Sequence, residues 1–292
     1  MKLLTVRHAT TYRYAGPVSL GPHRLMMRPR DSHDLRLVGA ELSLSPPGEI
    51  RWLHDVFGNS VALVTFPAPA SELRIVSTLK IERYALDRPQ FPIAPEAEMY
   101  PFVYSASDRT DLGPLLDRHY PDPTGIVDKW VKRFVTSRPM PTLDLLATIN
   151  ASIKNTFTYS ERHEEGTQSP MDTIARQSGA CRDLAVLFIE AARALGFGAR
   201  FVSGYFYDPA LDRGPQTPGV AATHAWADIY LPGAGWIEYD PTDAIIASEN
   251  LIRVAVTREP SQAIPISGTF TGASSDFLGM TIDVTVSASP PP

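Results

Sequence analysis

The sequence is poorest in cysteine, with a single one, Cys181, among 292 residues. One cysteine excludes an internal disulfide and is too few for a thiolate metal cluster. The seven histidines are scattered, and no two of them have the H-x-x-x-H spacing of a metal-ligand pair. We therefore expect neither a disulfide framework nor a metal ion or other cofactor.

Basic clusters and long apolar stretches are also missing. The net charge is −5, and no run of Lys or Arg forms a basic stripe. Nucleic-acid binding rests largely on clustered positive charge, so nucleic acid is not an expected partner. No stretch approaches the roughly 20 apolar residues that span a bilayer, so a membrane is not an expected partner either.

The first residues argue for a cytosolic location. The chain turns polar at Arg7 and His8, before the apolar core of a signal peptide is complete. In the reducing cytosol a free thiol remains available for reaction.

What the sequence does have is a change of periodicity along its length. Residues 1–86 consist of short apolar runs between Gly/Pro/Asn turns, and residues 73–82 alternate with period 2. This pattern predicts an antiparallel β-sandwich. Residues 87–123 are rich in proline and are interpreted as a connector, and residues 266–292 as a C-terminal strand segment that packs on the β-rich part.

Residues 124–265 change to helical spacing and then return to strands. Apolar spacing predicts helices near 126–134, 143–157, 169–179 and 181–195, with Thr142 as the N-cap of the second. Strands at 199–207, 223–230 and 235–239 follow, and residues 232–235 join the last two as a hairpin. The predicted fold class is therefore α+β, with a mixed core preceded by the β-sandwich.

Cys181 lies where a loop becomes a helix. A thiol with the reference pKa of about 8.5 is mostly protonated at neutral pH, but the N–H groups and the positive dipole end of a helix start favour the thiolate. Gly179 is expected to let the chain turn sharply just before. A lone cysteine is more often a small buried apolar residue, so Cys181 alone does not establish catalysis.

His224 and Asp240 add a base and a carboxylate in the chain order Cys–His–Asp. They lie on the two arms of the predicted hairpin, and their even separation places them on one face. A loop that pairs Tyr230 with Ala234 also pairs His224 with Asp240, with Cβ atoms about 4.5–5.5 Å apart. An inert strand histidine and a turn aspartate are the ordinary interpretations of each residue. Together with Cys181, the pair favours a nucleophilic triad.

Five neighbours are candidates for the oxyanion hole or the cleft. The N–H groups at the helix start can hold an oxyanion, and Arg182 can adjust the charge around the thiol. The aromatic candidates fit the walls of a cleft, but core packing explains them equally well. The five residues are Ala180, Arg182, Tyr159, Trp226 and Trp236.

At these positions the chain resembles the bacterial branch of the transglutaminase-like superfamily. The matching segments are SGACRDLA (178–185), RALG (193–196), ARFVSGY (199–205), THAW (223–226) and PGAGWIEYDPT (232–242). The segments YRY (12–14), PVSLGPHRL (17–25) and DVFGN (55–59) resemble the β-rich domain that precedes the core in this branch.

The resemblance implies a papain-like core in which Cys181 is the nucleophile, His224 the general base and acid, and Asp240 the residue that orients it. It also implies amide chemistry through a thioester, with transfer of the acyl group to water or to an amine. Animal members often use calcium, but no acidic loop here supports a calcium site. Ala180 stands where valine is common in the family.

Three functions remain open on this evidence. The main hypothesis is a cysteine peptidase or amidohydrolase acting on a peptide or protein substrate. Hydrolysis is slightly favoured because no amine-acceptor pocket is recognisable. The alternatives are a true protein-glutamine amine transferase and a non-catalytic peptide-binding module on the same fold.

Overall fold

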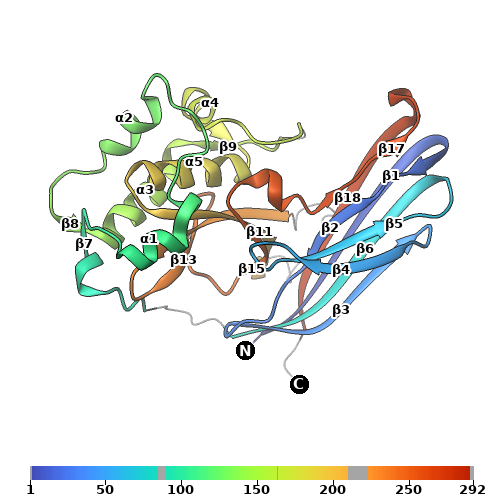
Figure 1. Cartoon of the computed structure of the whole chain (residues 1–292), viewed down its shortest axis with the longest axis horizontal. Helices are drawn as coiled ribbons and strands as arrows, with labels where there is room; N and C mark the ends of the chain where they lie inside the picture. The colour runs from blue at the N-terminus through green and yellow to red at the C-terminus, as the bar shows by residue number, and fades with distance from the viewer. Residues whose placement is uncertain (1, 85–89, 163, 210–222, 290–292) are drawn as a thin grey trace.

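The computed structural model describes residues 2–84, 90–162, 164–209 and 223–289. Figure 1 shows a two-sheet β-sandwich on one side and a helical region on the other, with a third sheet between them. This arrangement confirms the predicted α+β class with a β-rich N-terminal part. No helix among the described residues is long and apolar enough to cross a bilayer.

The sandwich consists of two antiparallel sheets. One has the strand order β17-β1-β6-β3, with β18 also paired to β1: β17 (Phe270–Thr271), β1 (Lys2–Leu20), β6 (Ala70–Arg83), β3 (Leu35–Ser45), β18 (Phe277–Ser289). The other has the order β16-β2-β5-β4: β16 (Ile266–Ser267), β2 (His23–Arg28), β5 (Ser60–Thr65), β4 (Glu49–His54).

Period-2 alternation places the apolar side chains of β6 between the two sheets. Leu73 and Ile75 are fully buried there against Leu25 and Val64. The alternation predicted for residues 73–82 is therefore present in the structure, because successive side chains of a strand point to opposite faces.

The C-terminal strand β18 completes the first sheet by running antiparallel to β1. Its register extends from Leu3 opposite Ser289 to Tyr14 opposite Phe277, so both ends of the chain lie in one sheet. This pairing places residues 277–289 on the β-rich part. The boundaries predicted for the four segments of the chain stay predictions.

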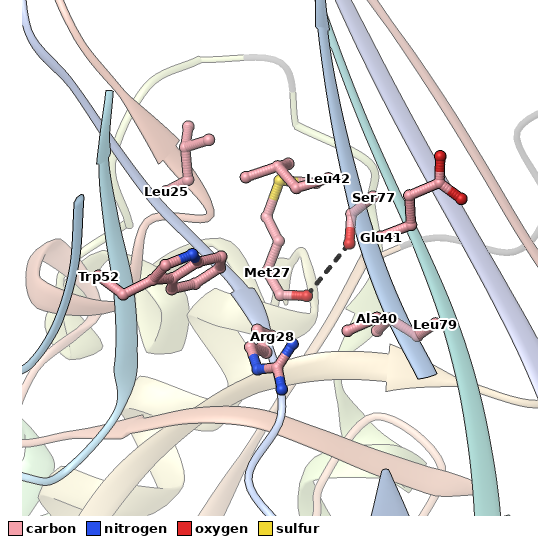
Figure 2. A pocket seen from close by; sticks show the side chains of 9 residues that line it. All are labelled: Leu25, Met27, Arg28, Ala40, Glu41, Leu42, Trp52, Ser77 and Leu79. Atoms are coloured by element: carbon pink, nitrogen blue, oxygen red, sulfur yellow. Dashed lines mark hydrogen bonds between the residues drawn. The ribbon is translucent and has the colours of Figure 1, made fainter. Parts of the chain in front are cut away.

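A shallow groove lies between the sheets of the sandwich. Figure 2 shows Trp52 on one wall and Leu79 on the other, with Met27 between them. The Ser77 hydroxyl donates a hydrogen bond to the Met27 carbonyl oxygen at 3.4 Å. The cavity measures about 30 Å³, and none of the residues that line it belongs to the predicted site.

The remaining elements form the core around one central helix, α5 (Cys181–Ala194). It packs on a sheet of order β14-β13-β12-β11-β15: β14 (Ile245–Ile246), β13 (Gly235–Asp240), β12 (Thr223–Leu231), β11 (Gly198–Phe206), β15 (Leu251–Thr257). The other helices and short elements are α1 (Ala106–Leu112), α2 (Ile126–Lys132), α3 (Thr142–Thr156), α4 (Pro170–Arg176), η1 (Pro95–Ala97), η2 (Gly113–Leu115), η4 (Pro260–Ala263), η5 (Ser274–Asp276), β7 (Met99–Tyr100), β8 (Met140–Pro141), β9 (Thr158–Tyr159) and β10 (Ser178–Gly179).

Helix α5 is buried on nearly every side, as its apolar spacing predicts. Leu187 and Phe188 are fully buried in the largest core cluster, and the Phe188 ring lies 5.3 Å from that of Tyr239 on β13. The same helix buries an ion pair, in which Arg193 Nη1 donates to Glu190 Oε1 at 2.8 Å. Such a pair is tolerated in a core only with further hydrogen bonds, and Glu190 also accepts one from the backbone N–H of His119.

One local prediction is wrong, and one segment contains more structure than its composition suggests. Pro141, not Thr142, occupies the N-cap position of α3, and the Thr142 hydroxyl donates instead to the Ala97 carbonyl at 2.7 Å. In the predicted connector, the residues from 90 onward include α1 and pack on the core, where Tyr104 and Leu112 are buried. High proline content concealed this helix, because proline limits backbone freedom without preventing packing.

The β-rich part joins the core sheet through a side chain that imitates a peptide group. Asn59 Nδ2 donates to the Val256 carbonyl at 2.7 Å, and Asn59 Oδ1 accepts from the Val256 N–H at 2.9 Å. Asp55, from the DVFGN segment, orients the amide by accepting from Asn59 Nδ2 at 2.8 Å. An apolar cluster that includes Leu4 and Tyr205 packs beside this clamp.

We predict that Asn59→Ala lowers the free energy of unfolding by about 2–4 kcal/mol, because it leaves two buried backbone groups of β15 without partners. Urea unfolding followed by tryptophan fluorescence measures the change. Asn155→Ala, which alters an exposed asparagine of α3, is the matched control. Equal stability of the two variants would contradict a role for the clamp.

Candidate active site

Cys181 is the first residue of α5, as the sequence predicts. Ala180 precedes it in an extended conformation, with φ −78° and ψ 170°. The Cys181 side chain is half-buried, and no described group accepts a hydrogen bond from its backbone N–H. The thiol therefore lies at the positive end of a long buried helix, with a free donor beside it.

A buried carboxylate fixes this helix start. Asp183 is fully buried, and its oxygens accept hydrogen bonds from the Ala180 N–H at 2.9 Å, the Gln168 N–H at 2.8 Å and Arg162 Nη1 at 2.9 Å. The Ala180 N–H is thus occupied by Asp183 and is not free to donate to an oxyanion. Arg162 and Gln168 were missed by the sequence analysis, because only the fold brings them to Asp183.

Position 179 requires glycine because a side chain would not fit there. The sequence analysis expected instead that Gly179 allows a sharp turn. Its φ is not positive, so no special turn conformation requires glycine. A Cβ at this position would lie 2.8 Å from the Cβ of Asp183 and 3.1 Å from Gln168 Nε2. The glycine therefore lets β10 pass close to the first turn of α5.

His224 and Asp240 meet as predicted, but not in the predicted register. His224 Nε2 and Asp240 Oδ2 are 2.7 Å apart. The ladder pairs Tyr230 with Trp236 and Ala227 with Tyr239, so His224 is not directly opposite Asp240. The register differs by two residues, which keeps both side chains on the same face.

The difference in register comes from the hairpin turn. Leu231 pairs with Gly235, and the loop consists of the three residues between them. Gly233 and Gly235 have φ values of 82° and 75°, which L-residues rarely adopt. The turn therefore closes one residue later than the sequence analysis placed it.

The pair is held tightly and links to the thiol. Asp240 is fully buried, and its Oδ1 accepts the Thr242 N–H at 2.9 Å. Burial by itself lowers the pKa of His224, but the hydrogen bonds with Asp240 and Cys181 and the charges of both raise that pKa to about 10. His224 is therefore positively charged at neutral pH, beside the sulfur. Because Nε2 faces Asp240, Nδ1 is the ring nitrogen left for Cys181.

Tyr159 lies next to Cys181 at the surface. It follows Thr158 in β9, which pairs with β10 in parallel, so Tyr159 is opposite Gly179. Its side chain is 52% exposed. Partial burial and the nearby Cys181 raise the pKa of Tyr159, which keeps its hydroxyl protonated at neutral pH. Tyr159 thus lies near the thiol, and its role as a cleft residue stays a prediction.

The other three candidates are placed differently from the prediction. Arg182 points away from the sulfur and donates to the carbonyl oxygens of Gly166 at 2.7 Å and Glu164 at 2.8 Å, which fastens that loop. Trp226 is fully buried under His224, with ring centroids 6.1 Å apart. Trp236 stacks under Arg200 near the hairpin turn, about 13 Å along β13 from Asp240. Neither tryptophan forms the wall of an open cleft at the thiol.

One group of side chains has the composition of a metal site. His224, Asp240 and Asp243 offer ligand atoms within 4.8 Å of one another. The first two are bonded to each other, and Asp243 Oδ1 accepts from Lys154 Nζ at 2.9 Å. A metal ion would have to displace both contacts, so the group fits a hydrogen-bonded triad better.

Family comparisons agree with this geometry. Residues 128–241 match the model of the transglutaminase-like superfamily, and residues 4–82 match that of the bacterial transglutaminase-like N-terminal region. The match over residues 128–241 ends just beyond Asp240 and contains Cys181 and His224. The chain belongs to the transglutaminase-like superfamily, in the branch with a β-rich N-terminal region.

Individual relatives match nearly the whole length of the chain. The chain is 25% identical over 288 residues to the uncharacterized protein Rv2569c of Mycobacterium tuberculosis, covering 96% of this chain and 91% of that protein. It is 23% identical over 282 residues to ML0607 of Mycobacterium leprae, covering 97% and 98%. The crystal structure of a candidate cysteine protease from Cytophaga hutchinsonii superposes with a TM-score of 0.70 at 19% identity, covering 100% of this chain and 92% of that chain. That likeness shows the fold.

Replacing Asp183 with Asn is expected to lower the free energy of unfolding by about 3–5 kcal/mol, because it leaves Arg162 facing a neutral partner in a buried site. Chemical denaturation measures the loss. Asp172→Asn is the matched control, since Asp172 holds the same third position in α4 but is exposed. A loss no larger than that of Asp172→Asn would contradict the role assigned to the Asp183 network.

The pH dependence of stability follows from His224. Its folded-state pKa of about 10 lies above the ordinary value of 6.5, so its stabilisation is complete below 6.5 and is lost as the pH rises through 10. We therefore expect the stability difference between wild type and His224→Gln to shrink from about pH 6 to about pH 10 in urea unfolding. The exposed His33, changed to Gln, is the control. A difference that stays constant with pH would refute the charged His224–Asp240 pair.

Proposed function

We propose that the protein is a cysteine hydrolase that cleaves amide bonds of peptides or proteins through a thioester intermediate. The family and the site together support a cysteine enzyme. The observation that carries the proposal is the convergence of a helix-start thiol, a charged imidazole and a buried carboxylate, contributed by α5, β12 and β13. Each has the environment that its role requires.

In the first half-reaction Cys181 attacks the amide carbonyl carbon. Because His224 already carries the proton on Nδ1, Cys181 attacks as the thiolate, a C–S bond forms, and the carbonyl oxygen becomes an oxyanion within reach of the Cys181 N–H. The tetrahedral intermediate then collapses, the C–N bond breaks, and His224 gives its proton to the leaving amine. Asp240 holds the ring through Nε2 and stabilises its charged form.

In the second half-reaction water takes the place of the amine. His224, neutral after giving its proton to the amine, accepts a proton from water as the water attacks the thioester carbonyl, and the C–S bond then breaks to release a carboxylic acid and restore the Cys181 thiolate beside the charged His224. A primary amine in place of water would yield a new amide, the reaction of an amine transferase. We favour water slightly, because it is present in large excess over any amine in solution. We also propose a cytosolic location, where a single thiol stays reduced.

Labelling of the thiol tests the nucleophile directly. Iodoacetamide is expected to label the wild type at neutral pH, and His224→Ala should slow labelling about tenfold or more, because the imidazolium favours the thiolate. Cys181→Ala must abolish both labelling and turnover of a peptide library, since no other cysteine exists. Turnover that persists in Cys181→Ala would sink the proposal.

Product analysis separates the three functions. We incubate glutamine-containing peptides with and without a primary amine and follow the products by mass spectrometry. Cleaved or deamidated peptides without an amine adduct support hydrolysis, and the adduct as main product supports the amine transferase. No product, together with a labelling rate that is unchanged in His224→Ala and titrates near the ordinary thiol value of about 8.5, indicates a binding module.

A further inference from the structure

The carboxylate of Asp240 lies at the start of a strained turn. Asp240 pairs with Ile245 of β14, and the intervening turn contains Ala244 at φ 57°. A left-handed conformation costs a residue other than glycine roughly 1–2 kcal/mol, so this turn is not favoured by its own backbone. Since Thr242 in the same turn donates to Asp240 Oδ1, the turn sets the direction of the carboxylate.

Helix α3 holds this turn at two points. Asn150 Nδ2 donates to the Ile245 carbonyl oxygen at 3.1 Å. Lys154 Nζ donates to Asp243 Oδ1 at 2.9 Å. Residues four apart lie on the same face of a helix, so both contacts come from one stripe of α3.

Asn150 places a polar amide in a buried, apolar environment. It is 1% exposed, on the face of α3 that buries Leu146, Ile149 and Ile153. Burying an amide costs free energy unless it forms hydrogen bonds, and its Oδ1 has no partner among the described residues. The bond to Ile245 is the only hydrogen bond of this amide that the described part of the chain provides. An apolar residue would suit the helix equally well if packing were its only task.

Lys154 forms an ion pair with Asp243, a second carboxylate near His224 and Asp240. Asp243 has an oxygen within 4.8 Å of the ligand atoms of His224 and Asp240. The Lys154–Asp243 pair is partly exposed, with side-chain exposures of 44% and 39%, so its direct contribution to stability is small. Its effect is to hold the Asp243 carboxylate away from His224, which would otherwise have two carboxylates competing for Nε2.

We propose that Asn150 and Lys154 are positioning residues of the active site, which hold the turn after β13 so that Asp240 alone meets His224. The inference rests on the proposed function. It adds a fourth element, α3, to the helix and the two strands that carry the triad. Neither residue touches the reacting atoms.

The first test is Asn150→Leu, which keeps the branching at Cγ and removes the hydrogen bond. The second-order rate of Cys181 alkylation is measured against pH in wild type, Asn150→Leu, Asp240→Asn and the double variant. We expect Asn150→Leu to slow alkylation at neutral pH about tenfold, with a rate that rises with pH as for an ordinary thiol. In the Asp240→Asn background the same change is expected to have no further effect on the rate.

Asn155→Leu is the matched control, because Asn155 is an exposed asparagine on the same helix. A purely structural role of Asn150 would lower the free energy of unfolding but leave the pH profile of alkylation as in wild type. That result, or equal slowing in the presence and absence of the Asp240 carboxylate, would overturn the proposal for Asn150.

The second test concerns Lys154. Lys154→Met is expected to slow alkylation several-fold, and adding Asp243→Asn should restore the wild-type rate because no free carboxylate then competes for His224. Lys132→Met, which removes an exposed lysine paired with Asp128 on α2, is the control. A Lys154→Met rate equal to that of Lys132→Met, or a lack of rescue, would overturn the proposal for Lys154.

These outcomes are distinct from failure of the proposed function. If the wild type turns over no peptide, the hydrolase proposal fails, but alkylation still reports on how His224 acts on Cys181. If peptide turnover is found and the alkylation profile of Asn150→Leu matches wild type, the positioning role alone fails.

Discussion

The buried carboxylate of Asp183 is the interaction on which the rest of the site depends. It accepts hydrogen bonds from three segments, namely the residue before the nucleophile, the backbone of Gln168 and the guanidinium of Arg162. A buried anion without such partners would destabilise the fold. The hydrogen bonds to Asp183 therefore hold these three segments in place. Because Asp183 belongs to the first turn of α5, satisfying its charge also fixes the direction of the Cys181 backbone.

A second buried carboxylate, Asp240, performs the matching task on the other side of the thiol. It joins the turn after β13 to the imidazole of His224. Its hydrogen bond and its charge help to raise the pKa of His224, against the burial that lowers it. The placements of Cys181 and His224 thus each depend on one fully buried acid. Both acids have their orientations set by backbone N–H groups, which move little once the fold has formed.

The β-rich part packs directly on the core sheet that contains β12 and β13. Asn59 binds the backbone of Val256 in β15, and β15 pairs with β11, the neighbour of the strand that carries His224. An apolar cluster shared by both parts, including Leu4, Leu79 and Ile252, removes water from the contact. The DVFGN segment, which the sequence analysis could only match to a family pattern, therefore helps to connect the two regions.

Much of this protein was predictable from the sequence because it depends on local rules. Period-2 alternation identified β6, helical spacing identified α5, and an even separation put His224 and Asp240 on one face. The exact hairpin register, the space required at Gly179 and the burial of Trp226 were not predictable, because they depend on turn conformation and on neighbours distant in the chain. The same holds for Arg162 and Asn150, which no local signal marks. Sequence alone determined the residue types and faces that meet, whereas the tertiary structure decided which buried charges and amides hold them, since only packing brings distant partners within hydrogen-bond distance.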